Sequence, residues 1–125
     1  MIPKTEEEIA LVQLSRKFKS ILRGGVVVDH SIFKSKAEDI TYNNWILVNY
    51  IEGIDTQAFD YRDAEGAKVS LIETDFKKIS QTVQELYSLA FARNDELSAL
   101  IKASPDPLSV DISSGWPKVP YELAS

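Results

Sequence analysis

The chain opens with a helical pattern of apolar and polar residues. Large apolar side chains recur every three or four positions between Leu11 and Leu22. Thr5-Glu6-Glu7-Glu8 precedes them in the order of a capping box, in which the Thr5 hydroxyl accepts a hydrogen bond from the amide of Glu8. Gly24-Gly25 follows, and glycine commonly ends a helix. We therefore predict a helix that begins after Thr5 and ends before Gly24.

The next segment predicts a short hairpin and then a second helix. Val26-Val27-Val28 is β-branched, and Ser31-Ile32-Phe33 returns against it through a turn at Asp29-His30. Residues 37 to 51 are rich in residues that favour strands, but Ser35-Lys36-Ala37-Glu38 reads as a second capping box. We predict a helix over 37–51 that ends at Gly53. Its expected buried face consists of Ala37, Ile40, Asn44, Leu47, Val48 and Ile51.

A second hairpin is predicted around Asp63-Ala64-Glu65-Gly66. Residues 57–61 and 67–72 flank this turn, and Gly66 can adopt the positive φ that such a turn needs. Apolar residues alternate along both segments, which is the pattern of a strand with one buried face. The residues on this face are Phe59, Tyr61, Val69 and Leu71.

A long helix, capped by Thr74 or Asp75, is predicted to run from Phe76 to Ala103, where Pro105 ends it. It would have about 29 residues and a length of roughly 43 Å. Its apolar stripe consists of Phe76, Ile79, Val83, Leu86, Ala90, Leu97 and Ile101. Because the helix is long for so small a protein, we expect one end to project or to pack against a copy or a partner. The candidate interface residues are Tyr87, Leu89, Phe91 and Arg93.

These elements predict an α+β fold: three helices and two short β-hairpins, with the long C-terminal helix packed on a small antiparallel sheet. A length of 125 residues with 44% hydrophobic residues is typical of one domain, so residues 1–125 are expected to form a single unit. The chain has no cysteine, which excludes disulfides, thiolate metal sites and thiol nucleophiles.

The charge of the chain and its hydropathy pattern argue against two kinds of partner. The net charge is −5, and acidic residues outnumber basic ones in the second half of the chain, which disfavours binding to nucleic acid phosphates. No apolar run approaches the roughly 20 residues that cross a bilayer. Met1-Ile2-Pro3-Lys4 leads into acidic residues and not into the apolar region of a signal peptide. We therefore expect no nucleic acid and no membrane as partners.

The residues that usually carry chemistry do not form a recognisable site. His30 is the only histidine and lies in a predicted turn. Asp60, Asp63 and Glu65 surround another turn, where acidic residues are common, and they lack the spacing of a calcium loop. Motifs for phosphate loops, dinucleotide binding and serine nucleophiles are missing. The sequence thus predicts a protein that is not an enzyme and that holds no cofactor or metal.

Two segments of the second half of the chain resemble a known family. They are Phe91-Ala92-Arg93-Asn94-Asp95-Glu96-Leu97, within the long helix, and Gly115-Trp116-Pro117, near the end. Together with the order of the preceding elements, they resemble a domain of unknown function found at the C-terminal end of tail-fibre and tail-fibre-assembly proteins of tailed bacteriophages. The resemblance covers about residues 9 to 117, and residues 118–125 form a tail beyond it.

The resemblance implies a noncatalytic phage tail component or tail-fibre assembly factor. Its expected partners are tail-fibre or baseplate proteins, with a homo-oligomer as a further possibility, and its expected location is the virion or the host cytoplasm during assembly. Independently of the resemblance, Trp116 lies between Gly115 and Pro117 soon after the long helix and has apolar surface to bury against its stripe, so we expect these three residues to form a structural anchor with Trp116 packed on the core. The alternative is a small carbohydrate- or receptor-binding module that uses Trp116 or Trp45 as an exposed platform.

The last residues allow two interpretations. Tyr121-Glu122-Leu123-Ala124-Ser125 either frays in solution or adds as a strand to the sheet edge of a neighbouring subunit. We expect fraying, because terminal residues are usually poorly ordered.

Overall fold

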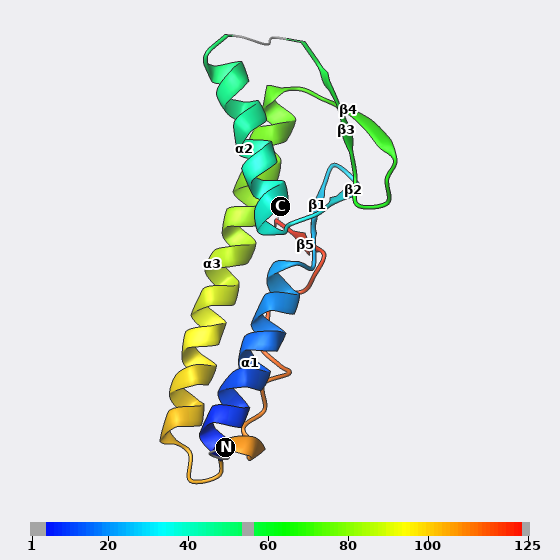
Figure 1. Cartoon of the computed structure of the whole chain (residues 1–125). Coiled ribbons are helices and arrows are strands. Elements are labelled where there is room, and N and C mark those ends of the chain that lie inside the picture. Colours follow the sequence, from blue (N-terminus) through cyan, green and yellow to red (C-terminus); the bar gives the residue numbers. More distant parts are fainter. Residues whose placement is uncertain (1–4, 54–56, 124–125) are drawn as a thin grey trace, which may run out of the picture.

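The structure is a computed structural model that describes residues 5–53 and 57–123. It has the predicted α+β architecture, with three helices and two small sheets (Figure 1). In chain order the elements are α1 (Glu6–Leu22), β1 (Val26–Val28), β2 (Ser31–Phe33), α2 (Ala37–Ile51), β3 (Phe59–Arg62), β4 (Lys68–Leu71), α3 (Glu73–Ala103), the 3-10 turn η1 (Pro107–Ser109) and β5 (Tyr121–Glu122). The expectations for Met1–Lys4 and for Ala124 and Ser125 fall outside the described residues.

The long helix α3 is covered along both halves of its length. Figure 1 shows α2 beside its first half and α1 beside its second half, both antiparallel to it, with the strands on one side. The η1 turn also packs against α1 and α3. The prediction that one end of this helix projects beyond the core is therefore wrong, whereas its packing against a copy or a partner stays a prediction. The helix has 31 residues, and this length lets two shorter helices pack end to end along it.

Two apolar clusters follow from this arrangement. The larger one surrounds Phe76 and Leu86 on α3 and includes residues of α2 and both hairpins. The smaller one joins Ala10 and Leu14 of α1 to the last turns of α3. Every residue of the predicted α3 stripe is buried, so the helical periodicity is confirmed.

The predicted ends of the first two helices are confirmed, but one cap is different. The Thr5 hydroxyl accepts from the Glu8 amide at 3.1 Å. The cap of α2 is Lys36, whose backbone amide donates to the Asp39 carboxylate at 3.2 Å, and not Ser35 as predicted. Ser35 is fully buried instead. Its hydroxyl donates to the Leu22 carbonyl at 2.6 Å and accepts from the Gly25 amide at 2.9 Å, which ties α2 to the end of α1.

Replacing Ser35 by alanine is expected to lower the free energy of unfolding by about 1–3 kcal/mol, because it leaves the Gly25 amide buried without its partner. Urea denaturation followed by circular dichroism measures this change. Ser20→Ala is the control, because Ser20 is exposed and bonds only within its own helix. Equal midpoints for the two variants would contradict the assigned role of Ser35.

The predicted buried face of α2 is wrong in part. Asn43 and Ile46 are buried, whereas Asn44 and Val48 are exposed and Ile51 is 70% exposed. The observed face is turned by about one position, or roughly 100°. This rotation brings Asn43 against α3, where its side-chain amide donates to the Phe76 carbonyl at 3.4 Å. Helical spacing alone did not distinguish the predicted face from the observed one, because α2 carries apolar side chains on all sides.

The second hairpin is confirmed, while the cap of α3 differs from the prediction. β3 and β4 pair with Phe59 opposite Leu71 and Tyr61 opposite Val69, so the four alternating residues share the buried face. The cap is Ile72, and its amide donates to the Asp75 carboxylate at 2.9 Å. Asp75 therefore lies in the first turn of α3, where its negative charge suits the helix dipole.

The prediction that the last residues fray is wrong for Tyr121 and Glu122. They form β5, which pairs in parallel with Val26 and Val27 of the same chain and gives a three-stranded sheet of order β2-β1-β5. The Tyr121 amide also donates to the Gly25 carbonyl at 2.9 Å. The pairing is possible because Gly24 has no side chain: a Cβ there would overlap Val119, which occupies this space.

Candidate interaction surface

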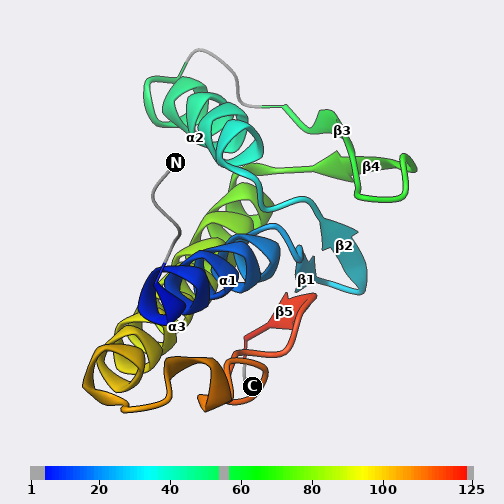
Figure 2. The same cartoon turned by 60° about the horizontal axis from the view of Figure 1, so that its bottom comes forward.

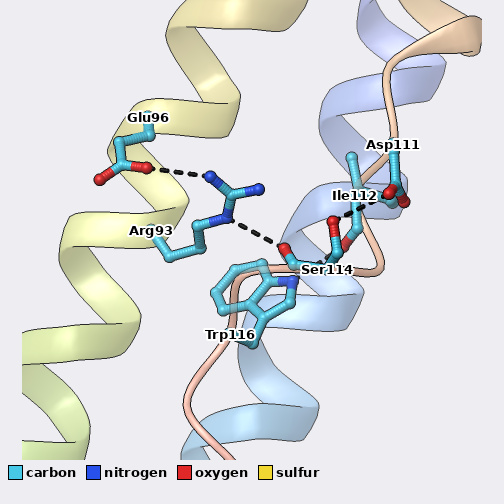
Figure 3. A network of polar contacts seen from close by, with 6 residues as sticks. All are labelled: Arg93, Glu96, Asp111, Ile112, Ser114 and Trp116. Atoms are coloured by element: carbon cyan, nitrogen blue, oxygen red, sulfur yellow. Dashed lines mark hydrogen bonds and ion pairs between the residues drawn. The ribbon is translucent and has the colours of Figure 1, made fainter.

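The two segments that carry the family resemblance meet in the structure. Figure 3 shows residues 111 to 116 beside α1 and α3, with Arg93 of α3 directed at them. Arg93 Nε donates to the Ser114 carbonyl at 3.0 Å, and its Nη1 donates to the Glu96 carboxylate at 2.9 Å. Gly115 has a φ of +84°, and a Cβ there would overlap the Arg93 guanidinium. The glycine thus allows the loop to approach the arginine closely.

A turn at Asp111 shapes the loop before Trp116. One Asp111 carboxylate oxygen accepts from the Ser113 hydroxyl at 2.6 Å and from the Ser113 amide at 2.8 Å. The other oxygen accepts from the Ser114 hydroxyl at 2.8 Å. These hydrogen bonds, first of all the one from the Ser113 hydroxyl, lower the pKa of Asp111 from 3.8 to about 2.

This lowered pKa predicts how the turn responds to acid. Because the pKa is lower in the folded chain, the carboxylate stabilises the turn above pH 3.8, and this contribution is lost as the pH falls toward about 2. The Asp111 carboxyl carbon should titrate with a midpoint of about 2 in an NMR pH series. In Ser113→Ala the midpoint should move upward. A midpoint near 3.8 in the parent chain would contradict the hydrogen-bonded turn.

Trp116 connects the loop to both apolar clusters. The side chain is partly buried and packs against each of them. Its indole Nε1 donates to the Ile112 carbonyl at 2.8 Å, as Figure 3 shows. The ring also lies 6.4 Å from the ring of Phe18 on α1, measured between centroids. These contacts match the anchor predicted from the position of Trp116 after the long helix.

A shallow hollow lies where α3 faces the Gly115–Pro117 segment. Its volume is about 290 Å³. The residues around it are Leu89, Ala92, Arg93, Glu96, Gly115, Trp116 and Pro117. It therefore brings together two candidate interface residues, Leu89 and Arg93, and all three members of the predicted anchor. Glu96 and Ser114 were missed in the sequence, although the spacing of Arg93 and Glu96 is that of a helical ion pair.

The other two candidate interface residues lie elsewhere on α3. Phe91 is 51% exposed and contacts Phe18 edge to face at 4.9 Å between ring centroids. Tyr87 is partly buried, and its hydroxyl donates to the Ser35 carbonyl at 2.8 Å. The Tyr87 side chain thus contributes to the contact between α3 and the start of α2. The four residues do not form one continuous surface.

The remaining sequence candidates lie in turns. His30 is exposed in the tight turn between β1 and β2, with a φ of +71°. Asp63 accepts from the amides of Glu65 and Ala67 and so stabilises the β3–β4 turn, while Asp60 pairs with Lys68 at 3.5 Å. Within residues 5–53 and 57–123, no three acidic or histidine side chains are grouped to hold a metal ion.

Comparisons of the chain with protein-family models, with characterised proteins and with solved structures found no match. In the described part of the chain, no helix is long and apolar enough to cross a membrane.

Proposed function

We propose that this protein is a noncatalytic bacteriophage tail component or tail-fibre assembly factor that acts through protein–protein contacts. The observation that carries the proposal is the hollow beside Trp116. The two segments that resemble the tail-fibre-associated domain, Phe91-Ala92-Arg93 and Gly115-Trp116-Pro117, contribute Ala92, Arg93 and all three loop residues to its walls. The partner in this proposal is a tail-fibre or baseplate protein.

Exposed leucines supply the apolar part of the contact. Leu89 is 40% exposed and Leu100 is 54% exposed. Leu89, Arg93 and Leu100 are separated by four and seven residues, so they lie on one side of α3. Burying a large apolar side chain contributes about 1.5–3 kcal/mol, which makes these two leucines the energetic centre of the proposed interface.

Arg93 and Glu96 supply the polar part of the proposed contact. The Arg93 guanidinium is already held by the Ser114 carbonyl and the Glu96 carboxylate. A side chain that is fixed before binding loses less conformational entropy when a partner docks. The pair therefore offers the partner a prepared hydrogen-bonding site beside the leucines.

The test is a double variant, Leu89→Glu with Leu100→Glu. Binding to the cognate tail-fibre or baseplate protein should weaken by tenfold or more, because two charges replace apolar contacts, while the circular dichroism spectrum should stay unchanged. Ile51→Glu is the matched control, because Ile51 is more exposed than either leucine and lies on α2. Light scattering and co-purification measure the complex and any self-association.

The two versions of the proposal, a tail component and an assembly factor, differ in whether the protein is present in the mature virion. A tail component is present in purified virions at a fixed copy number, whereas an assembly factor is not. A chain that binds no tail protein and stays monomeric, with the double variant behaving like the parent, would contradict both versions.

A second candidate is a small carbohydrate- or receptor-binding module. The observation that favours it is the exposure of Trp45, which is 58% exposed on α2. Trp116 suits this role less well, because its indole N–H already donates within its own loop.

A further inference from the structure

Aromatic rings form a ladder from the core to the surface at the end of the molecule where α3 begins. The buried Phe76 contacts Tyr61 of β3 edge to face at 5.5 Å. Tyr61 lies nearly parallel to Tyr42 of α2, with centroids 5.9 Å apart and an interplanar angle of 17°. Tyr42 lies nearly parallel to Trp45, at 6.2 Å and 19°. Figure 2 shows the helix and the hairpin that carry these rings, α2 and β3–β4.

The outer rings of the ladder are unusually accessible for aromatic side chains. Tyr42 is 45% exposed and Trp45 is 58% exposed. Their inner neighbour Tyr61 is fixed by Phe76 and by Phe33, whose ring is 6.0 Å away. The ladder therefore presents apolar ring surface to the solvent on a rigid support, and little side-chain entropy is lost when a ligand covers it.

A cavity of about 250 Å³ lies beside Tyr42 and Tyr61. Its volume is below the roughly 300–1,000 Å³ of sites for drug-sized ligands, so it suits a group about one ring in size. Besides the two tyrosines, three acidic and two basic residues line it: Asp39, Asp60, Asp63, Lys34 and Arg62. Residues with hydrogen-bond acceptors and residues with donors thus both adjoin the two tyrosines.

Most of these polar groups are held in place by the fold. The Asp39 carboxylate accepts from the Lys36 amide at the cap of α2, and the Asp63 carboxylate accepts from two turn amides. Arg62 donates to the Gly66 carbonyl at 3.0 Å. Carboxylates and guanidinium groups form several hydrogen bonds each, so these contacts fix the groups and leave further capacity for a ligand.

We propose that this cavity and the adjoining aromatic ladder bind one neutral pyranose ring of a saccharide. The face of a pyranose carries C–H bonds with partial positive charge, which the negative face of an aromatic ring attracts. Its hydroxyl groups both donate and accept, which matches a wall of carboxylates and cations. An apolar peptide would cover these charged groups without pairing them, and the excess of carboxylates disfavours an acidic sugar.

This inference deepens the second candidate function and is independent of the proposed tail-protein interface. The contact residues are Tyr42, Tyr61 and the carboxylates, with Trp45 extending the apolar surface toward a neighbouring ring of the saccharide. The hollow beside Trp116 has no part in it, so the leucine double variant should bind sugar as the parent does.

NMR titration tests the site, because the chain has two tryptophans and each gives its own indole N–H signal. The ligands are methyl glycosides of glucose, galactose, mannose and N-acetylglucosamine, oligosaccharides of each, and glucuronic and sialic acid. A neutral saccharide should shift the indole signal of Trp45 and the amides of residues 59–63 in a saturable way. The signal of Trp116 should stay in place and serves as the internal reference.

Three variants assign the contacts. Tyr42→Ala should weaken binding at least tenfold, whereas Tyr42→Phe should retain most of it because the ring face remains. Asp60→Asn should weaken binding several-fold without affecting folding, since its carboxylate is exposed and pairs only with Lys68 at the surface. Ile51→Ala, outside the cavity on the same helix, should bind like the parent.

Several results would overturn the inference. One is that none of the neutral saccharides gives a saturable shift of Trp45. Others are acidic sugars that bind more tightly than neutral ones, and binding that is unchanged in both Tyr42→Ala and Asp60→Asn. Saturable binding of a displayed peptide at these residues, with no saccharide binding, would assign the site to a protein partner instead.

Discussion

Replacing Phe76 by alanine is expected to lower the free energy of unfolding by about 3–5 kcal/mol. The side chain is completely buried, and its ring contacts the rings of Tyr50, Phe59 and Tyr61 from α2 and β3. Alanine would leave a cavity at the point where α3, α2 and the second hairpin meet. Urea denaturation followed by circular dichroism gives the change directly.

Phe91→Ala is the control for this measurement, since it removes the same ring from the same helix at a site that is 51% exposed. We expect it to cost about 1 kcal/mol or less. If the two variants were equally stable, the assignment of Phe76 to the centre of the core would be wrong.

Replacing Trp116 by alanine is expected to lower the free energy of unfolding by about 3 kcal/mol, at the low end for such a change because part of the ring is exposed. The side chain contacts both apolar clusters, and its indole N–H bonds the Ile112 carbonyl. Trp116→Phe keeps most of the ring and loses the hydrogen bond, so it should cost about 1 kcal/mol. Both values come from the same urea titrations.

Trp45→Ala provides the comparison within the chain, because Trp45 is the only other tryptophan and is 58% exposed. Its removal should change stability by less than about 1 kcal/mol. A cost below about half a kcal/mol for Trp116→Ala would instead show that the Gly115–Pro117 segment contributes little to the fold.

The elements of this fold could be predicted where local signals agreed. The bounds of α2 match the prediction despite a composition that favours strands, and the register of β3 and β4 follows from strict alternation. The stripe of α3 follows from its periodicity. Each of these features depends on residues that are close in sequence. One amino-acid sequence is therefore enough to predict it.

Features that depend on distant residues could not be predicted in this way. The pairing of β5 with β1 needs Val119 to fill the space above Gly24, and nothing near Tyr121 indicates this. The rotation of α2 places Asn43 against Phe76 of α3, a contact between residues 33 positions apart. Ser35 looked like a cap because its spacing to Glu38 is right, but a buried position between two helices determined its role.

The residues of the candidate interaction surface could also be predicted from nearby sequence, whereas the contacts between distant residues could not. The resemblance identified Arg93 and the Gly115-Trp116-Pro117 segment separately, but the sequence did not indicate that Arg93 bonds Ser114, 21 residues away and directly before this segment. Tyr87 lay off the apolar stripe and was assigned to a partner, whereas its hydroxyl reaches Ser35 across 52 residues. The aromatic ladder was also hidden, because Tyr42 and Tyr61 come from elements whose relative placement only the fold determines.

The end-to-end packing of α1 and α2 along α3 has a consequence for how the protein opens. The two apolar clusters share the helices α1 and α3 and one side chain, Trp116, so the protein resembles two small cooperative units joined in series. Backbone amides near Leu97 should then exchange with solvent through opening of the α1 end, independently of those near Leu86. A ligand that rigidifies one unit would slow amide exchange in the other only as far as α1, α3 and Trp116 transmit the effect.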